Sequence, residues 1–424
     1  MKIDMNIDVH HVTRVEGHGN IKVKVQDGEL REAMWQVVET PRFFEAMLRG
    51  KSHDLAPTLT SRICGICSIG HTLASLRTVE RAMKIEIPRT AQLLRMLGKH
   101  GETLQSHFLH LFFLVVPDFF NVDSVIPITQ SHPEVAGVAL RLKGLANDMS
   151  DLLTGRTTHP VSLVVGGLSV APNKKQLAAL KQTILDRLPD VETAVAVFQG
   201  LTLPDFVRET EFVSLKGENE YPWIGGDLIS TDGVVKPEDE YRAMTNEYKE
   251  DFTTTKFTKL SRKSFAAGAL ARLNNNFKLL HPQAREVSKS LGLEPVNHNP
   301  YMNNVAQLVE CLHVALESVE IIDELLDDKY EDICAEYEVR AGEGVGAVEV
   351  PRGILYHNYQ IDDEGFVRKA NCIIPTTQNN GNIHHDMPEL VKHEVAKGSS
   401  DKEITRLCEM LVRAYDPCIS CSVH

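Results

Sequence analysis

Two short stretches near opposite ends of the sequence each carry a pair of cysteines. The first is RICGICSIGH, residues 62–71, and the second is DPCISCSVH, residues 416–424; each has a histidine shortly after its second cysteine. Two cysteines separated by two residues can bind one metal ion together, so the two pairs supply four thiolate ligands. Nearly the whole chain separates the pairs. The fold must therefore bring its C-terminal segment back beside residue 64.

Four thiolates are soft ligands that select zinc, copper(I), nickel or iron. Three interpretations are open at this point: a structural zinc site with four cysteine ligands, a redox metal, and a dithiol redox pair. Zinc ribbons are small knuckles in glycine-rich turns, whereas here one pair begins a predicted core helix and the other lies at the end of the sequence. A large helical core does not need a zinc ion for stability. These features favour the redox metal.

The bulk composition is that of a soluble globular protein. The 424 residues are 42% hydrophobic and 24% charged, and the net charge of -13 argues against a nucleic-acid partner. Eight cysteines are too few for a disulfide scaffold, so a reducing compartment is expected. Charged and polar residues follow Met1–Asp4, and no uncharged apolar window of about 18 residues occurs. The sequence therefore predicts no export signal, no membrane span and a cytoplasmic location.

The elements that must position the cysteines are mostly helices. Alternating residues and turn residues predict strands over 9–40 and over 342–375, and Pro41 is expected in the first turn of a helix. Periodic apolar residues predict the helices 71–83, 88–116 (ended by Pro117), 133–153, one from 172 with a break or kink at Pro189, 303–328, 387–396 and 402–414.

The predicted fold class is mainly α with peripheral β (α+β). We expect one large domain over 1–424, built on a core helical bundle, with an N-terminal β-hairpin region and a C-terminal tail that returns to the core. Its parts are the N-terminal strands and first helix (1–50), core helices (51–200), a variable region without assigned chemistry (201–300), and a core helix, strands and the C-terminal metal motif (301–424).

The two cysteine motifs resemble those of the nickel–iron hydrogenase large subunit. The family patterns R-x-C-G-x-C-x-x-x-H and D-P-C-x-x-C-x-x-H are both matched in full. Further similar segments are TRVEGH at 13–18, RFFE at 42–45, VPRG at 350–353 and IPTT at 374–377. The resemblance thus runs from start to finish and is weakest over residues 200–300.

The resemblance implies a nickel–iron centre held by four cysteines. Cys67 and Cys421 would bridge nickel to an iron that also carries carbon monoxide and cyanide, and Cys64 and Cys418 would be terminal on nickel. The implied reaction is the heterolytic cleavage of dihydrogen into protons and electrons, with a terminal sulfur or a nearby base taking the proton.

An arginine and an aspartate are expected beside this centre. Arg352 is similar to the family arginine that lies over the open face of the metals, and a permanently charged guanidinium suits the polarisation of a bound ligand. The alternative is a buried arginine paired with an acid such as Asp416 or Glu349. Asp416, two positions before Cys418, is the expected partner of Arg352.

Three further residues take their expected roles from the resemblance. Thr376 would donate a hydrogen bond to a cyanide, and Pro351 would shape the same pocket. His71 is expected to donate a hydrogen bond to a bridging sulfur rather than to bind metal.

A carboxylate and a second cation site complete the expected set. Glu16 resembles the first proton carrier beyond Cys418, which requires a raised pKa and a hydrogen bond to sulfur; the alternative is an ordinary acidic residue in a turn. Glu45, His424 and the backbone carbonyl of Cys372 resemble the ligands of a Mg²⁺ or Fe²⁺ ion. The other cysteines, Cys311, Cys334 and Cys408, are expected to be core residues on helix faces. Asp118 is a candidate for the pocket.

The electrons must leave through partners, because the sequence has no further cysteine cluster for iron–sulfur centres. The resemblance implies an iron–sulfur small subunit near Cys64 and Glu16, then subunits of the flavin, deazaflavin, nicotinamide or heterodisulfide-reductase type. It also implies nickel-insertion factors and a maturation protease, which in the family removes a tail after the last histidine. Rival interpretations are a membrane-bound energy-converting hydrogenase subunit and a zinc-binding interaction scaffold; the quinone-site subunit of NADH dehydrogenase lacks the four cysteines.

Overall fold

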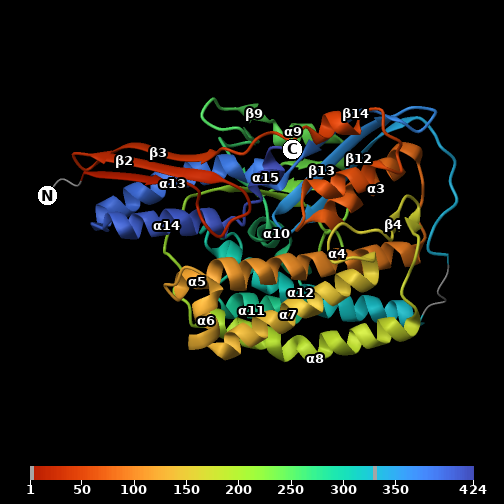
Figure 1. The fold of residues 1–424 in the computed structure, drawn as a ribbon, viewed down its shortest axis with the longest axis horizontal. Coiled ribbons are helices and arrows are strands. Elements are labelled where there is room, and N and C mark those ends of the chain that lie inside the picture. Colours follow the sequence, from red (N-terminus) through yellow and green to blue (C-terminus); the bar gives the residue numbers. More distant parts are fainter. Residues whose placement is uncertain (1–3, 328–331) are drawn as a thin grey trace.

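A computed structural model of the chain describes residues 4–327 and 332–424. Figure 1 shows two layers: a lower layer of long helices, and an upper layer that holds the sheets and the C-terminal helices. The predicted α+β class with a helical core is confirmed. Among the described residues, no helix is both long and apolar enough to span a membrane.

The helical layer is built around two long and largely buried helices, α4 and α12, which pack against each other. The helices of this layer are α4 (Arg89–Leu109), α5 (Val116–Phe119), α6 (Val125–Ser131), α7 (Pro133–Thr154), α8 (Lys174–Gln199), α11 (Pro282–Ser290) and α12 (Met302–Asp327). α4 packs against α7 and α12, and α8 packs against α7 and α12. Local signals set their ends: Gly155 follows α7 with a φ of 79°, and Asn173 forms a capping box with Gln176 at the start of α8.

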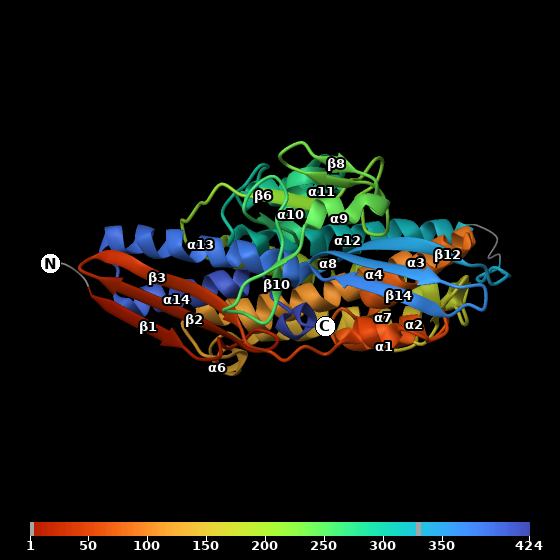
Figure 2. The same ribbon diagram turned by 90° about the horizontal axis from the view of Figure 1, so that it is seen from above.

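The upper layer contains two antiparallel three-stranded sheets at opposite ends of the molecule (Figure 2). One is formed by β1 (Met5–Val9), β2 (Gly19–Gln26) and β3 (Glu29–Val37), and the other by β12 (Gly342–Val350), β13 (Gly353–Ile361) and β14 (Val367–Ile373). The helices of this layer are α1 (Phe44–Leu48), α2 (Ala56–Thr60), α3 (Ser68–Met83), α13 (Pro375–Lys397), α14 (Asp401–Ala414) and α15 (Ile419–Ser422).

Helix α3 lies directly on the C-terminal sheet because the first three residues on one face of β12 are glycines. A Cβ atom at Gly342, Gly344 or Gly346 would collide with backbone carbonyls of Ala82, Thr78 and Ala74 in α3. The period of two places these glycines on the same face of the strand. This close packing fixes the N-terminal end of α3, where Cys67 lies, relative to the turn that follows β12.

The segment 201–300 forms short elements along one edge of the molecule (Figure 2). They are β6 (Glu211–Leu215), β7 (Leu228–Ser230), β8 (Val235–Lys236), α9 (Tyr241–Thr245), β9 (Tyr248–Lys249), β10 (Lys256–Phe257), β11 (Phe265–Ala266) and α10 (Ala269–Asn276); β4 (Leu163–Val164) and β5 (Gly167–Leu168) form a further small hairpin. The irregular character predicted for this segment is confirmed.

Several predicted boundaries are wrong, each for a local reason. The helix expected to end at Pro117 continues through a π-helical stretch, His110–Val115, into α5, where Pro117 occupies a first-turn position that needs no N–H. α13 begins at Pro375 rather than 387. α8 shows no break at Pro189. α1 begins at Phe44, so Pro41 precedes its first turn. The predicted helix end at 328 lies outside the described residues.

Candidate metal centre

The two cysteine pairs occupy the ends of two helices that meet in the core. Cys64 follows a 3-10 turn (Ser61–Ile63), and Cys67 immediately precedes α3. Cys418 immediately precedes α15, and Cys421 lies within it. All four side chains are buried, with at most 4% exposed, and belong to the main hydrophobic core. The predicted return of the C-terminal segment to residue 64 is therefore present.

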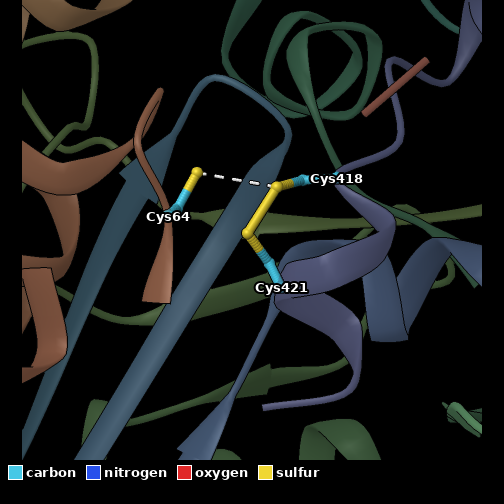
Figure 3. Close-up of side chains that lie close together, drawn as sticks. All are labelled: Cys64, Cys418 and Cys421. Carbon is cyan, nitrogen blue, oxygen red and sulfur yellow. Dashed lines mark hydrogen bonds between the residues drawn. A yellow bond between two sulfur atoms is a disulfide. The ribbon is translucent and has the colours of Figure 1, made fainter. Parts of the chain in front are cut away.

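The sulfur atoms of Cys64, Cys418 and Cys421 lie close together (Figure 3). Sγ of Cys64 lies 3.5 Å from Sγ of Cys418. Ligand atoms of Cys64, Cys418 and Cys421 lie within 4.8 Å of one another, and so do those of Cys67, His71 and Cys421. The Sγ atoms of Cys418 and Cys421 are in direct contact.

The surroundings favour a thiolate at Cys64. The amides of Ile66 and Cys67 donate hydrogen bonds to its sulfur, at 3.3 and 3.1 Å. The interaction with the Cys67 side chain lowers the pKa of the Cys64 thiol against the effect of burial, and the positive charge of Arg352 acts in the same direction. The same side-chain interaction, together with burial, raises the pKa of Cys67 well above its ordinary value.

Arg352 extends from the turn between β12 and β13 and is buried. Its Nε donates to the backbone oxygen of Asp416 at 2.7 Å, and its Nη2 donates to Asp416 Oδ1 at 2.9 Å. The predicted contact with Asp416 is thus present, whereas the alternative partner, Glu349, pairs with Arg272. Burial opposes the charged guanidinium, but Asp416 and then the sulfurs of Cys64 and Cys67 raise the pKa of Arg352.

One N–H group of Arg352 has no partner among the described residues. Its Nη1 atom is fully buried and makes no hydrogen bond. A buried donor without an acceptor costs about 1–3 kcal/mol, so such groups usually face a ligand or an ion. The residues present therefore fit a metal group that is held by four sulfurs and carries hydrogen-bond acceptors towards Arg352.

Asp416 and Thr376 are themselves held in place. Asp416 has a φ of 48°, and its Oδ2 accepts a hydrogen bond from Gln307 Nε2 at 3.2 Å. His110 Nε2 lies 3.9 Å from Asp416 Oδ1. Thr376 lies in the first turn of α13, and its Oγ1 accepts a hydrogen bond from the Cys418 amide at 3.0 Å. The hydroxyl hydrogen of Thr376 then remains for another acceptor.

Glu16 lies beside the C-terminal motif and is connected to it through Ser420. The Ser420 amide donates to Glu16 Oε2 at 3.0 Å, and the Ser420 hydroxyl donates to Oε1. The Ile419 amide donates to the backbone oxygen of Glu16 at 2.9 Å. Among the described residues, the hydrogen bonds of this carboxylate go to Ser420, and the expected direct hydrogen bond to the Cys418 sulfur is absent.

A second group of possible ligands meets at the C-terminal histidine. His424 Nε2 lies 2.7 Å from the carbonyl oxygen of Cys372 and 3.9 Å from Glu45 Oε1. The Cys372 amide donates to Glu45 Oε1 at 2.7 Å. Burial raises the pKa of Glu45, but the nearby His424 and the Cys372 amide lower it, to about 2. A carboxylate, a carbonyl and an imidazole are thus gathered where a hard cation could bind.

His71 lies between the cysteines and a second buried histidine. Its Nδ1 is 3.3 Å from His357 Nε2, and its own Nε2 is buried without a hydrogen-bond partner among the described residues. Burial, followed by the charge of His357, lowers the pKa of His71 well below its ordinary value, which keeps the ring neutral. A neutral ring with one free nitrogen can still interact with a nearby sulfur.

The remaining expected residues are Asp118 and three further cysteines. Asp118 is paired with Arg413, at 2.7 Å, and with Arg14, and its place in the pocket stays a prediction. Cys311 and Cys408 are buried on α12 and α14, as predicted. The prediction for Cys334 as a core residue on a helix face is wrong: it is exposed and lies outside any helix. Two charged neighbours in a short segment, Asp332 and Glu336, indicated this exposure.

Sequence reasoning missed residues that support the pocket. Arg42 Nη2 donates to the carbonyl oxygens of Ile63 and Ser420, at 2.7 and 2.5 Å, and so links the two cysteine segments. Gln307 holds Asp416 from α12. Arg42 belongs to the RFFE segment at 42–45, which could have indicated it. Nothing in the local sequence distinguishes Gln307 from any other polar residue of a helix.

Comparisons with known proteins agree with this geometry. The sequence pattern of the nickel-dependent hydrogenase family matches residues 42–136 and 204–424, and a pattern described as HoxL-like matches residues 6–40. Sulfhydrogenase 1 subunit alpha of Pyrococcus furiosus is 32% identical over 422 residues, which cover 99% of this chain and 97% of that protein.

Two further relatives point the same way. The NAD-reducing hydrogenase HoxS subunit beta of Cupriavidus necator is 27% identical, with 97% of this chain and 93% of that protein covered. A crystal structure of an NAD⁺-reducing [NiFe]-hydrogenase in the H2-reduced state superposes with a TM-score of 0.90 at 25% identity and covers 99% of both chains. The chain belongs to the nickel-dependent hydrogenase family, as an oxidoreductase that acts on dihydrogen.

Proposed function

We propose that Cys64, Cys67, Cys418 and Cys421 bind one nickel and one iron. Cys67 and Cys421 would bridge the two metals, Cys64 and Cys418 would be terminal on nickel, and the iron would carry carbon monoxide and cyanide. The observation that carries this proposal is the convergence of buried sulfurs from the two ends of the chain beside an Arg352 Nη1 without a partner. A structural zinc site would leave the Nη1 donors of Arg352 without an acceptor.

When bound, such a centre supplies Lewis acidity towards dihydrogen and accepts its electrons. Side chains of this protein would accept the proton and carry it away. The sulfur of Cys418 would take the proton, and Glu16 would carry it away. Ser420 holds the Glu16 carboxylate in place, because its amide and its hydroxyl both donate to that carboxylate.

The other pocket residues would orient and polarise the groups bound at the metal centre. Arg352, aligned by Asp416, directs its free N–H towards the open face of the pocket. Thr376 uses its hydroxyl hydrogen for a cyanide, and Pro351 shapes the wall next to Arg352. His71 donates to a bridging sulfur through its unpartnered ring nitrogen.

A second cation, Mg²⁺ or Fe²⁺, is proposed at Glu45, the Cys372 carbonyl and His424. The contacts that gather these three groups support the site. Its effect is structural, because His424 Nδ1 also lies 3.0 Å from the carbonyl oxygen of Cys421. The cation would thereby hold the last turn of the chain and the bridging cysteine in position.

Electrons are proposed to leave through an iron–sulfur small subunit. The relatives named above are subunits of larger hydrogenases, and one is described as NAD-reducing. We therefore extend the proposal to a soluble acceptor system of the nicotinamide or flavin type; the deazaflavin and heterodisulfide-reductase types are the alternatives. A cytoplasmic location, nickel-insertion factors and a maturation protease belong to the same proposal and remain predictions.

The test is elemental analysis combined with infrared spectroscopy on the complex purified without oxygen. Nickel and iron in equal amounts in this chain, with absorption bands of metal-bound carbon monoxide and cyanide, would support the proposal. Zinc as the only metal, without such bands, would support the interaction scaffold instead. Co-purification of subunits with membrane spans would favour the energy-converting type of enzyme.

A further inference from the structure

We propose that Arg272 is a positioning residue for Arg352, which it holds over the metal pocket through the backbone of the preceding turn. The inference deepens the proposed function and rests on it, because it concerns the guanidinium assigned to the open face of the centre. Arg272 belongs to α10, within the segment that the sequence marked as variable and without chemistry. It is fully buried.

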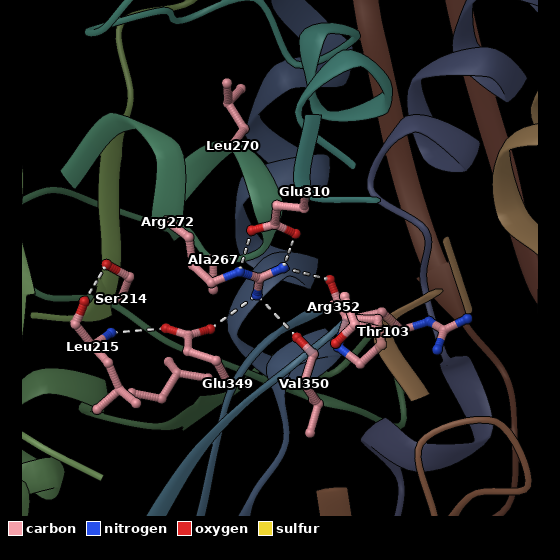
Figure 4. A network of polar contacts seen from close by, with 12 residues as sticks. Thr103, Ser214, Leu215, Ala267, Leu270, Arg272, Glu310, Glu349, Val350 and Arg352 are labelled. Carbon is pink, nitrogen blue, oxygen red and sulfur yellow. Dashed lines mark hydrogen bonds and ion pairs between the residues drawn. The ribbon is translucent and has the colours of Figure 1, made fainter. Parts of the chain in front are cut away.

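The guanidinium of Arg272 joins two carboxylates to two backbone carbonyls (Figure 4). Its Nε and Nη2 donate to the two oxygens of Glu310, at 2.6 and 2.7 Å, and its Nη1 donates to Glu349 Oε2 at 2.9 Å. The same side chain donates to the carbonyl oxygens of Val350, at 2.9 Å, and Pro351, at 3.2 Å. These carbonyls belong to the two residues immediately before Arg352.

Helix α10 is itself fixed, so its arginine can act as an anchor. The amide of Ala267 donates to Asn379 Oδ1 at 2.8 Å, and the amide of Leu270 donates to Asn303 Oδ1 at 3.0 Å. The start of α10 is therefore attached to both α13 and α12. The side chain of Arg272 then extends from a rigid support to the turn.

The turn fits closely against this support. Gly353 has a φ of 133°, and a Cβ atom there would lie 2.6 Å from the Cβ of Ala267. Asn379 Nδ2 donates to the carbonyl oxygen of Arg352 at 3.1 Å. Arg272 and Asn379 thus fix the backbone of the turn, while Asp416 fixes the side chain of Arg352. The direction of the free Nη1 follows from these constraints.

Only arginine can make this set of contacts. Two carboxylates and two carbonyls need a planar donor with several N–H groups in fixed directions, and a lysine ammonium supplies three donors from one point. The positive charge of Arg272 is also needed, because it is paired with Glu310 and Glu349, which are both fully buried. Loss of the guanidinium would leave two buried carboxylates short of a partner.

The test compares Arg272→Lys with a matched control, Arg95→Lys. Arg95 is also a buried arginine that pairs with one glutamate, Glu80, and donates to two backbone carbonyls, of Val164 and Gly167, at 2.7 and 3.1 Å. Glu80 lies near the C-terminal end of α3, whereas Cys67 lies at its N-terminal end. The two variants should cost similar stability, but only Arg272→Lys should affect the pocket.

The purified complex is used to measure metal content, infrared bands and the rate of dihydrogen oxidation. The full chain without metal is used to measure hydrogen–deuterium exchange. In the complex, Arg272→Lys should keep the parent's nickel and iron content, shift the carbon monoxide and cyanide bands, and lower the rate of dihydrogen oxidation about 10- to 100-fold. In the full chain without metal, hydrogen–deuterium exchange of the amides of Val350, Arg352 and Gly353 should become faster. Arg95→Lys should leave the bands, the rate and this exchange unchanged.

Unchanged bands and exchange in Arg272→Lys, or equal changes in both variants, would overturn the proposal. If Arg272→Lys does not fold, Glu349→Gln replaces it, because this variant keeps the shape but removes one charge that orients Arg272. A band shift relative to the parent that Arg95→Lys does not show supports the proposal, and unchanged bands overturn it. Absence of the bands from the parent would refute the proposed function alone, and the exchange at 350–353 would still decide the role of Arg272.

Discussion

At the scale of single residues, the chemistry depends on a few buried groups whose neighbours set their charge. Cys64 is favoured as a thiolate by two amide hydrogen bonds and by Arg352. Arg352 keeps one N–H free in the interior, where an unpaired donor is costly. Glu16 is held by Ser420 beside the cysteine proposed to receive the proton.

Replacement of Glu16 by glutamine should separate proton transfer from metal binding. Glutamine keeps the shape but cannot carry the proton, so the exchange of isotope between dihydrogen and heavy water should slow about 100-fold or more, with metal content unchanged. Glu39→Gln is a suitable control, because Glu39 is a nearby carboxylate whose ion pair is with the exposed His18. Exchange at the parent rate in Glu16→Gln would remove Glu16 from the proton route.

Replacement of Cys421 by serine should abolish the centre, because Cys421 is the sulfur shared by both clusters of possible ligands. A serine hydroxyl is a hard and weakly acidic ligand that does not bridge two soft metals. Nickel and iron should both be lost, as measured by elemental analysis. Cys311→Ser, a buried cysteine on α12, should keep both metals. Retention of both metals by Cys421→Ser would contradict the proposed bridging role.

At the scale of elements, the site depends on how closely α3 lies on β12. The three glycines of β12 let the helix backbone approach the sheet, and this packing places Cys67 near the turn that carries Arg352. α10 supports the same turn from the other side through Arg272. The positions of the cysteines and of Arg352 therefore depend both on the close backbone contact between α3 and β12 and on long side chains such as that of Arg272.

A single methyl group added at this contact should be destabilising. In Gly344→Ala the new Cβ would collide with the carbonyl oxygen of Thr78, so the free energy of unfolding should fall by about 1–3 kcal/mol. Gly144→Ala on α7 is the control, since its Cβ would meet no atom within 4 Å and should stabilise the helix by up to about 1 kcal/mol. Urea unfolding of the full chain measures both. Equal stability of Gly344→Ala and the parent would show that α3 can move away from β12.

At the scale of the whole molecule, the centre joins segments from the two ends of the chain. The first pair is positioned by α3 and the second by α15, and the long helices of the lower layer come between them in the sequence (Figure 1). Arg42 adds a link between the two segments through Ile63 and Ser420. A bound metal centre would close this very long loop, which couples metal binding to the stability of the entire fold.

The unfolding temperature should therefore depend on the metals. Since only the folded chain gathers the four sulfurs, bound metal stabilises it by mass action, and the metal-loaded chain should unfold several degrees above the metal-free chain. Calorimetry on parent and Cys421→Ser proteins measures the difference. The variant should match the metal-free parent, and a midpoint independent of metal loading would show that the chain binds metal without gaining stability.

The amino-acid sequence by itself determined the type of chemistry. The spacing of Cys64, Cys67, Cys418 and Cys421 predicts a shared metal site, because two residues between cysteines suit one ion whatever the fold around them. The long helices could also be predicted, since periodic apolar faces are local signals. Where a local signal misled, as at Pro117, the surrounding packing decided whether the helix continued.

Only the tertiary structure decided which residues surround the sulfurs. Gln307 and Arg272 are ordinary polar residues in their helices, and their roles arise from contacts with segments distant in the sequence. The same is true of Glu16, whose hydrogen bonds go to Ser420 rather than to the expected sulfur. Ligand type is a property of single residues and their spacing, whereas orientation and hydrogen bonding depend on how distant elements pack, which no local pattern encodes.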